Sequence, residues 1–338
     1  MSPKPTDRVD GALFPQISVV IPIYNGETDL PELIRCLRSQ TYPPDRFECL
    51  LVDNNSRDRT AEILQTASRE ENIGIRPLAQ TEIQSSYAAR NSGIKAAKGE
   101  ILAFTDADCR PQSQWLERLV QPFAREAVGL VAGEIVALPG ETLLERHAER
   151  HDTLSQKYTL AHPFCPYGQT ANLAVRRCIF DRVGLFRPYL TTGGDADLCW
   201  RILRQTDWQL EFAPEAIVRH RHRTTLKQLR GQWRRYGQSN RYLHELHGVN
   251  LMGEPTRWQY LRRIARWLLK EIPKTGIKAV GAIGRSDTPT PQHQLLDILD
   301  TPIDLLNTIA RARGQQNANL SEQAQKIEWL SEDRGESE

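Results

Sequence analysis

Two aspartates stand one residue apart in the stretch ILAFTDADCR at residues 101–110. The apolar run before them predicts a short buried strand, so Asp106 and Asp108 follow its carboxyl end. In an open α/β sheet the ligand crevice lies at these ends. Two carboxylates so close together repel each other, and a hard divalent cation with oxygen ligands relieves that repulsion. Because Mg²⁺ and Mn²⁺ bind through carboxylates and substrate phosphates, the pair predicts a metal–diphosphate site.

The aspartate pair has two other interpretations, a solvated turn and a calcium-binding loop. Acidic residues after a strand are often solvated turn residues, and this alternative stays open. A calcium-binding loop would place Asp106, Asp108 and Glu117 at ligand positions one, three and twelve. In such a loop, however, Arg110 would occupy the fifth position and Pro111 would replace the glycine of the sixth. A calcium loop is therefore disfavoured.

Two histidines, His147 and His151, stand four residues apart in the stretch HAERH and share one face of a predicted helix. The zinc-protease pattern requires a glutamate directly after the first histidine, and Ala148 occupies that position. We therefore expect an ordinary surface helix here, without a metal.

The composition of the 338 residues, 39% hydrophobic and 25% charged, is that of an ordinary globular protein. A net charge of +2 gives no reason to expect nucleic acid as a partner. The six cysteines lack CxxC spacing, which indicates reduced thiols in a cytoplasmic protein. Neither a signal peptide nor a run of about 18 apolar residues is apparent, so we expect no membrane-spanning segment.

Strands and helices alternate in the first third of the chain. Apolar, β-branched runs predict strands, and each is followed by a segment with helical periodicity. This alternation predicts an open, doubly wound, mostly parallel α/β sheet. No GxGxxG follows the first strand, which disfavours a dinucleotide-binding protein. The predicted strands are 17–23, 47–53, 73–80 and 101–106, and the predicted helices are 27–40, 60–70 and 86–100.

The pattern becomes mixed after residue 109. It predicts helices over 115–124 and 145–158, and strands over 129–138 and 213–220. Beyond this last strand the chain becomes basic and helical, and it ends in a polar tail after about residue 314.

Four polar clusters lie where predicted structure ends, and their order and separations are similar to those of the family 2 glycosyltransferases of the GT-A fold. The clusters are PIYN at 22–25, DNNS at 53–56, DAD at 106–108 and GGDAD at 193–197. The linking stretches SYAARNSGIKAAKGE, QTANLAVRRCIFDRVGLF and RHRHRTTLKQLRGQWRRYGQSN also resemble that family.

The resemblance implies a GT-A domain with a nucleotide-binding half and a mixed acceptor half, followed by C-terminal helices. The implied boundaries are a flexible N-terminus at 1–15, the catalytic domain at 16–240, a helical extension at 241–313 and a polar tail at 314–338.

The resemblance also implies a nucleotide-sugar donor and a divalent metal, Mn²⁺ or Mg²⁺. Asp108 would coordinate the metal through the donor diphosphate, and Asp106 would lie at the ribose and the metal. Arg90 and Asn91, on the helix before the acidic strand, would lie near the diphosphate.

The resemblance further implies that Tyr24, Asp53 and Asn54 line the pocket of the nucleotide base. Some relatives have an aspartate that favours uracil at the position of Asn54, and an asparagine both donates and accepts, so the base stays open. The residues implied to bind the nucleotide sugar are Pro22, Tyr24, Asn25, Asp53, Asn54, Arg90, Asn91 and Asp106.

The GGDAD cluster corresponds to the family motif that carries the general base. Gly194 stands where many members have a glutamate, so the resemblance assigns the base to Asp195, with Asp197 as the alternative. A carboxylate in hydrogen-bond reach removes the proton of an acceptor hydroxyl in the transition state. Such a single displacement inverts the anomeric centre.

A histidine after the strand at 213–220 serves as a further metal ligand in relatives, and His220 is our candidate. His222 is the alternative, and both could instead be solvated residues of a basic loop. Trp200 and Trp233 are candidate platforms for an acceptor sugar, although a buried-core role is equally compatible with tryptophan.

A basic helix is predicted over residues 257–285, where arginines and lysines alternate with Trp258, Trp267 and other apolar side chains. Such a helix is suited to peripheral contact with an anionic membrane, or alternatively to packing on the catalytic domain.

The sequence therefore predicts inverting, metal-dependent transfer of a sugar to a saccharide or lipid-linked acceptor, in surface polysaccharide or glycolipid synthesis. We expect the protein in the cytoplasm, at the inner face of the cell membrane if the basic helix binds there. One alternative is a nucleotidyltransferase. That activity would need a lysine in the loop after the first strand, and this loop, PIYNGETDL, contains none. The other is a catalytically silent sugar- or nucleotide-binding protein.

Overall fold

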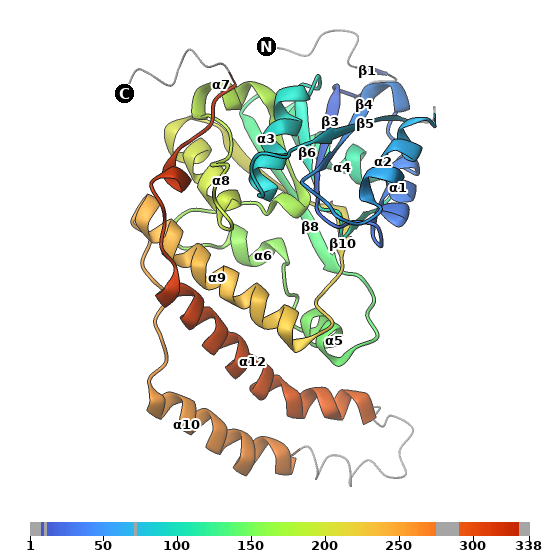
Figure 1. Ribbon diagram of the computed structural model, residues 1–338. Helices are drawn as coiled ribbons and strands as arrows, with labels where there is room; N and C mark the ends of the chain where they lie inside the picture. Colours follow the sequence, from blue (N-terminus) through green and yellow to red (C-terminus); the bar gives the residue numbers. More distant parts are fainter. Residues whose placement is uncertain (1–7, 10–11, 71–72, 275–290, 331–338) are drawn as a thin grey trace. The chain divides into compact units, whose positions relative to one another are not determined.

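The chain forms two compact units in the computed structural model, which describes residues 8–9, 12–70, 73–274 and 291–330 (Figure 1). The first unit comprises Met1–Leu138, Leu154–Arg221 and Leu320–Glu338, and the second comprises Pro139–Thr153 and His222–Asn319. The resemblance implied that the catalytic domain ends at residue 240 and the helical extension at residue 313. In the structure the chain instead leaves the first unit at Arg221 and rejoins it from Leu320. On that return, the Leu185 amide donates to the Glu328 carbonyl over 2.7 Å.

The first unit is built on a mixed sheet with the strand order β5-β4-β3-β6-β9-β8-β10-β7. The strands of the N-terminal half run parallel to one another, as predicted. Antiparallel β9 then joins β6 to β8, and antiparallel β7 lies at the far edge beside β10. The strands are β3 (Ile17–Ile23), β4 (Phe47–Asp53), β5 (Gly74–Ala79), β6 (Ile101–Phe104), β7 (Cys109–Pro111), β8 (Val128–Ala137), β9 (Leu173–Arg176) and β10 (Gln209–His220). A separate two-stranded sheet joins β1 (Arg8–Val9) and β2 (Ala12–Leu13).

Both faces of this sheet are covered, which explains why β3 is buried at every position. Ile17, Val19 and Ile21 belong to a core shared with α1 (Leu30–Arg38), α2 (Thr60–Ser68) and α4 (Trp115–Val120). On the opposite face a Cβ on Gly93 would lie 2.4 Å from Val20, so only glycine lets α3 (Ser86–Ala96) approach β3 so closely.

Short helices complete the first unit. The helix predicted over 145–158 is interrupted, because Asp152 and Leu154 adopt positive φ values of 47° and 77°. The remaining helices of this unit are α6 (Gln156–Leu160), α7 (Phe180–Val183), α8 (Gly194–Gln205) and the 3₁₀ turns η2 (Pro44–Arg46), η3 (Gln121–Ala124), η4 (Thr170–Asn172), η5 (Arg177–Ile179) and η7 (Gln323–Gln325).

The second unit is helical. Its two longest helices, α9 (Leu226–His247) and α12 (Pro291–Asn317), lie side by side (Figure 1). Their backbones touch at two glycines, since a Cβ on Gly237 would lie 1.9 Å from the Arg311 carbonyl oxygen and one on Gly314 would lie 2.0 Å from that of Arg234. The other helices are α5 (Leu143–Arg150), α10 (Arg257–Arg266) and the π-helical turn η6 (Trp267–Glu271). Residues 275–285 of the predicted basic helix lie outside the described residues.

None of the helices in the described parts of the chain combines the length and apolar character needed to cross a membrane.

Candidate active site

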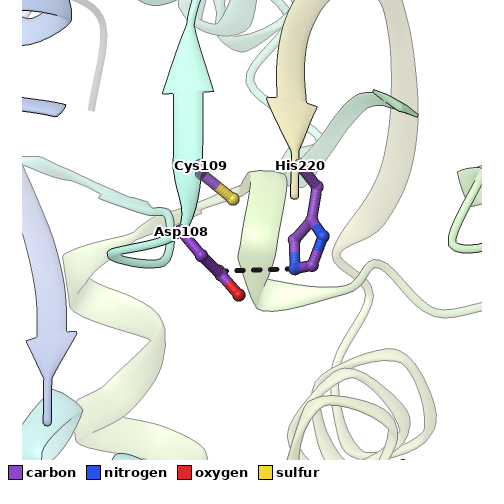
Figure 2. A group of neighbouring side chains, drawn as sticks. All are labelled: Asp108, Cys109 and His220. Atoms are coloured by element: carbon purple, nitrogen blue, oxygen red, sulfur yellow. Dashed lines mark ion pairs between the residues drawn. The ribbon is translucent and has the colours of Figure 1, made fainter. Parts of the chain in front are cut away.

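The pairing of β7 with β10 brings Asp108 and His220 together. In this antiparallel pair Cys109 lies opposite His220, and the Arg221 amide donates to the Asp108 carbonyl oxygen over 3.1 Å. As a result Asp108 Oδ1 lies 3.4 Å from His220 Nε2 (Figure 2). The Asp108 side chain is about one quarter exposed, at 24%, whereas His220 is buried. One atom of each residue therefore points to a common position that remains accessible from solvent.

Cys109 is the third member of this group, with its sulfur within 4.8 Å of the other two ligand atoms (Figure 2). Burial raises the pKa of the Cys109 thiol well above its ordinary range, and the charge of Asp108 raises it further. Mg²⁺ and Mn²⁺ prefer carboxylate oxygens, whereas soft sulfur ligands select other metals such as Zn²⁺ and Cu⁺. Asp108 and His220 are the members suited to hold a divalent ion.

Asp106 is anchored by an arginine from the opposite side of the site. Arg90 on α3 is buried and its Nη2 lies 2.5 Å from Asp106 Oδ1. Burial raises the pKa of Asp106, the positive charge of Arg90 opposes this rise, and the charge of Asp108 adds to it. The charge of Asp195 also contributes to the rise in the pKa of Asp106, so the Asp195 carboxylate lies close enough to act on Asp106.

Asp195 stands in the first turn of α8 with its carboxylate held by one residue. Thr170 donates to it twice, from the hydroxyl over 3.0 Å and from the backbone amide over 3.2 Å. Asp195 itself is only partly buried. The carboxylate is thus oriented, with lone pairs left for a further donor.

A tyrosine explains why glycine precedes Asp195. The Gly194 amide donates to the Tyr87 hydroxyl over 2.9 Å, and a Cβ on Gly194 would lie 2.7 Å from the Tyr87 ring. The glutamate that the resemblance would place at this position has no room beside this ring.

Asp197 is fully buried and structural. Its two carboxylate oxygens accept from Arg187 Nε over 3.0 Å and from Arg201 Nε over 3.1 Å. Arg201 in turn donates to the carbonyl oxygens of Val183 and Leu185. Because its carboxylate is committed to two arginines and has no exposed surface, Asp197 is not a suitable base for a substrate. The alternative assignment of the base is therefore wrong.

The first two polar clusters meet at the carboxyl edge of the parallel strands, because Ile23 of β3 lies opposite Asp53 of β4. There the Asn25 amide donates to Ser56 Oγ over 2.8 Å, and the Ser56 amide donates to Asp53 Oδ1 over 3.0 Å. Tyr24 projects from this edge, 54% exposed. Tyr24, Asn25 and Asp53 are thus placed at the edge where the resemblance expects the nucleotide, whereas Pro22 is buried within β3.

Two predicted donor-binding asparagines are instead committed to the protein interior. Asn54 is buried, and its Nδ2 donates to the carbonyl oxygens of Gln80 and Ile83 over 2.8 Å each. Asn91 is buried as well, and its amide group bonds both backbone groups of Phe186 and the Glu328 carboxylate. Their side chains hold loops in place. The prediction that they contact the donor directly is therefore wrong.

The two tryptophans predicted as acceptor platforms have different surroundings. Trp200 is fully buried, donates from Nε1 to the Cys165 carbonyl over 2.8 Å, and packs edge-on against Phe164 and Tyr167. It is a core residue, so that assignment is wrong. Trp233 is partly buried on α9, with its ring centroid 5.4 Å from that of Tyr236. Its role in acceptor binding stays a prediction.

Sequence reasoning did not assign a role to Thr170, Tyr87 or Cys109. Thr170 and Tyr87 lie in stretches that resemble the family, but their roles depend on contacts with Asp195 and Gly194 that lie 25 and 107 residues away. Cys109 could have been noticed, since it directly follows the predicted metal ligand Asp108.

Comparison with known proteins identifies the family of the chain. Residues 18–186, half of the chain, match the model of the family described as glycosyl transferase family 2. One relative, the glycosyltransferase AglE of Haloferax volcanii, is 38% identical over 226 residues, which cover 65% of this chain and 72% of the relative. The chain belongs to glycosyl transferase family 2. It is therefore a glycosyltransferase, as predicted.

A second relative and a solved structure extend the comparison. The undecaprenyl-phosphate 4-deoxy-4-formamido-L-arabinose transferase of Pseudomonas aeruginosa is 34% identical over 137 residues, 40% of this chain but only 38% of that protein. A mannosyltransferase from Pyrobaculum calidifontis, solved in complex with GDP-Man and Mn²⁺, superposes with a TM-score of 0.58. It is 18% identical, and the match covers 90% of this chain and 87% of that one. This likeness confirms the GT-A fold.

Proposed function

We propose that this glycosyltransferase uses a nucleotide-sugar donor and a divalent metal, and transfers the sugar with inversion. The observation that carries the proposal is the approach of Asp108 and His220 to 3.4 Å beside the Arg90–Asp106 ion pair. Together these residues supply an anionic and an imidazole ligand for a cation, next to a buried arginine. The Mn²⁺ and GDP-Man bound to the P. calidifontis mannosyltransferase are consistent with this assignment.

The donor atoms of Asp108 and His220 fit a divalent ion. In the octahedral shell of Mg²⁺ or Mn²⁺, bonds of about 2.0–2.2 Å place neighbouring ligands about 3 Å apart, so the 3.4 Å separation would have to close only slightly on binding. A bound Mn²⁺ or Mg²⁺ acts as a Lewis acid that neutralises charge on a leaving diphosphate. Arg90 adds a fixed positive charge, and Asp106 keeps its guanidinium in position.

Asp195 is our candidate for the general base. Thr170 orients its carboxylate, and its charge acts on Asp106, which supports a place near the donor. From there Asp195 would take the proton of an acceptor hydroxyl as the sugar is transferred. Attack on the face opposite the leaving diphosphate inverts the anomeric centre.

We also propose a lipid-linked acceptor at an anionic membrane, in surface polysaccharide or glycolipid synthesis. The undecaprenyl-phosphate transferase relative is named for such an acceptor, although the match covers only part of it. In this chain α10 buries none of its residues, and Trp258 and Leu269 are 73% and 77% exposed. Exposed apolar side chains among arginines suit the surface of an anionic bilayer.

Donor turnover is the direct test of this function. We would incubate the full chain with UDP- and GDP-linked sugars, with Mn²⁺ or with a chelator, and measure release of the nucleotide diphosphate with and without a polyprenyl-linked saccharide, which offers sugar hydroxyls. We expect metal-dependent release from one donor class that increases with this lipid-linked acceptor. Metal-independent turnover would contradict the proposed metal site, and turnover indifferent to the lipid-linked saccharide would contradict the acceptor.

A further inference from the structure

The helical unit carries a second cluster of potential metal ligands. Two of them come from the stretch HAERH, for which the sequence pattern predicted an ordinary surface helix. His147 lies on α5 and His151 at its C-terminal end, and Asp300 lies in the N-terminal half of α12, a helix that contacts α5. One ligand atom from each residue lies within 4.8 Å of the other two. The expectation of a surface helix is wrong for His147, which is only 6% exposed.

Both imidazoles are directed at the same carboxylate oxygen. Asp300 Oδ1 lies 3.6 Å from His147 Nε2 and 3.3 Å from His151 Nε2, and the two ring centroids are 4.4 Å apart. The first distance is too long for a hydrogen bond, and the buried His147 Nε2 has no hydrogen-bond partner in the part of the chain that the structure describes. A buried polar atom without a partner costs free energy, so its retention in this position needs an explanation.

The two histidine–carboxylate distances match the coordination shell of one small cation. For tetrahedral Zn²⁺, with bonds of about 2.0–2.1 Å, neighbouring ligand atoms lie about 3.3–3.4 Å apart. The two histidine–carboxylate distances, 3.6 Å and 3.3 Å, bracket this value. A site made of two imidazoles and one carboxylate also favours transition metals over Mg²⁺ and Ca²⁺.

The neighbouring charges leave the ligands available. Arg150 approaches the other Asp300 oxygen at 3.5 Å, but its closer partner is Asp297 at 2.6 Å. His151 is 43% exposed, which gives an ion access from solvent.

We propose that His147, His151 and Asp300 form a binding site for a zinc-class divalent ion, with water completing the shell. Such an ion would link α5 to α12. These helices are distant in the sequence, since His151 and Asp300 are 149 residues apart. The site does not depend on the proposed catalytic metal, because Asp108 belongs to the other unit.

The test uses the full chain carrying Asp108→Ala, so that the proposed catalytic metal site is disabled. After chelator treatment and dialysis, we would measure Zn²⁺ affinity and stoichiometry, the visible absorption of bound Co²⁺, and the melting temperature with and without Zn²⁺. We expect one equivalent of Zn²⁺, Co²⁺ bands of low-symmetry coordination, and a higher melting temperature with Zn²⁺.

Two further changes in that background identify the ligands. His151→Ala alters a half-exposed residue and Asp300→Asn keeps the side-chain shape, and we expect each to weaken Zn²⁺ binding at least tenfold and to remove the Zn²⁺-induced rise in melting temperature. Glu149→Gln, an exposed position on the same helix, is the matched control and should bind as the parent does. Unchanged affinity in both ligand variants, or no Zn²⁺ bound by the parent, would overturn the proposal.

Discussion

The two aspartates of the GGDAD cluster illustrate how neighbouring residues of one type acquire different roles. Asp195 is partly exposed and, among the described residues, its carboxylate accepts hydrogen bonds from Thr170 alone, so it can accept a proton. Asp197, two residues later, faces inward and is bonded to Arg187 and Arg201. Helical geometry places these positions on different faces of α8, which separates catalysis from structure.

We expect Asp195→Asn to lower turnover by about 10²–10⁴-fold, because asparagine cannot accept the proton of the acceptor. Binding of the donor should stay near that of the unmodified protein, since the change lies on the acceptor side of the reaction. Initial-rate kinetics, with donor affinity measured separately, would check this. A variant that retains most of its turnover would assign the proton to another group.

The opposite pattern is expected for Asp197→Asn. Removing one partner of a buried ion pair leaves an uncompensated charge on Arg201, and such losses cost about 3–5 kcal/mol. Urea unfolding of this variant should therefore show a large loss of stability, and Asp195→Asn provides the matched control with little loss. Equal stabilities for the two variants would rule out the structural role of Asp197.

At the scale of elements, the parallel half of the sheet was predictable because burial on both faces produces continuous apolar runs in strands such as β3 and β4. The same logic located Asp106 and Asp108, which follow β6 directly. The burial of Asn54 and Trp200 was not predictable, because it depends on loops and aromatic side chains from distant parts of the chain. One of the two partners of Asp197 is likewise set by tertiary packing, since Arg187 belongs to a separate loop, whereas Arg201 lies on the same helix.

Glu48 links three elements at the opposite, amino end of the sheet. Its carboxylate accepts from Ser18 Oγ and the Lys98 amide, and forms an ion pair with Arg76 at 2.5 Å. Burial tends to raise the pKa of Glu48, but the hydrogen bonds from Ser18 and Lys98 and the Arg76 charge lower it overall. A lowered pKa in the folded state means that ionised Glu48 stabilises the fold above its unfolded pKa of about 4.3, and that this contribution is lost as the pH falls through the folded value.

We therefore expect Glu48→Gln to lower the stability at pH 7 by about 1–2 kcal/mol, and the difference from the unmodified protein to shrink as the pH falls below about 4. Melting temperatures measured across this pH range test the prediction. Glu62→Gln, which removes an exposed carboxylate paired with Arg59, should change the melting temperature less. A difference that grows on acidification would contradict the account of Glu48.

At the scale of the whole molecule, attachment to a membrane would occur without a spanning helix among the described residues. The basic residues of α10 and η6 include Arg257, Arg262 and Lys270, each worth about 1 kcal/mol near an anionic surface. Exposed Trp258 and Leu269 would add apolar contact with the bilayer. Such attachment weakens as salt screens the charges.

We expect the full chain to co-sediment with phosphatidylglycerol vesicles at low salt and to be released at high salt. The double variant Trp258→Ala/Leu269→Ala should bind more weakly, whereas Tyr158→Ala, an exposed aromatic residue outside this helix, should bind normally. Protein that stays in the supernatant at low salt would argue for a soluble acceptor.

The most direct test of the central claim is calorimetric titration of UDP and GDP in the presence of Mn²⁺. The unmodified protein should bind one of the two only with the metal, and a chelator should abolish that binding. Asp108→Ala and His220→Gln should lose metal-dependent binding, whereas Cys109→Ala, which removes the neighbouring thiol, should keep it. Equal nucleotide affinity in the unmodified protein and Asp108→Ala, or binding that is indifferent to the chelator, would contradict the proposed metal site.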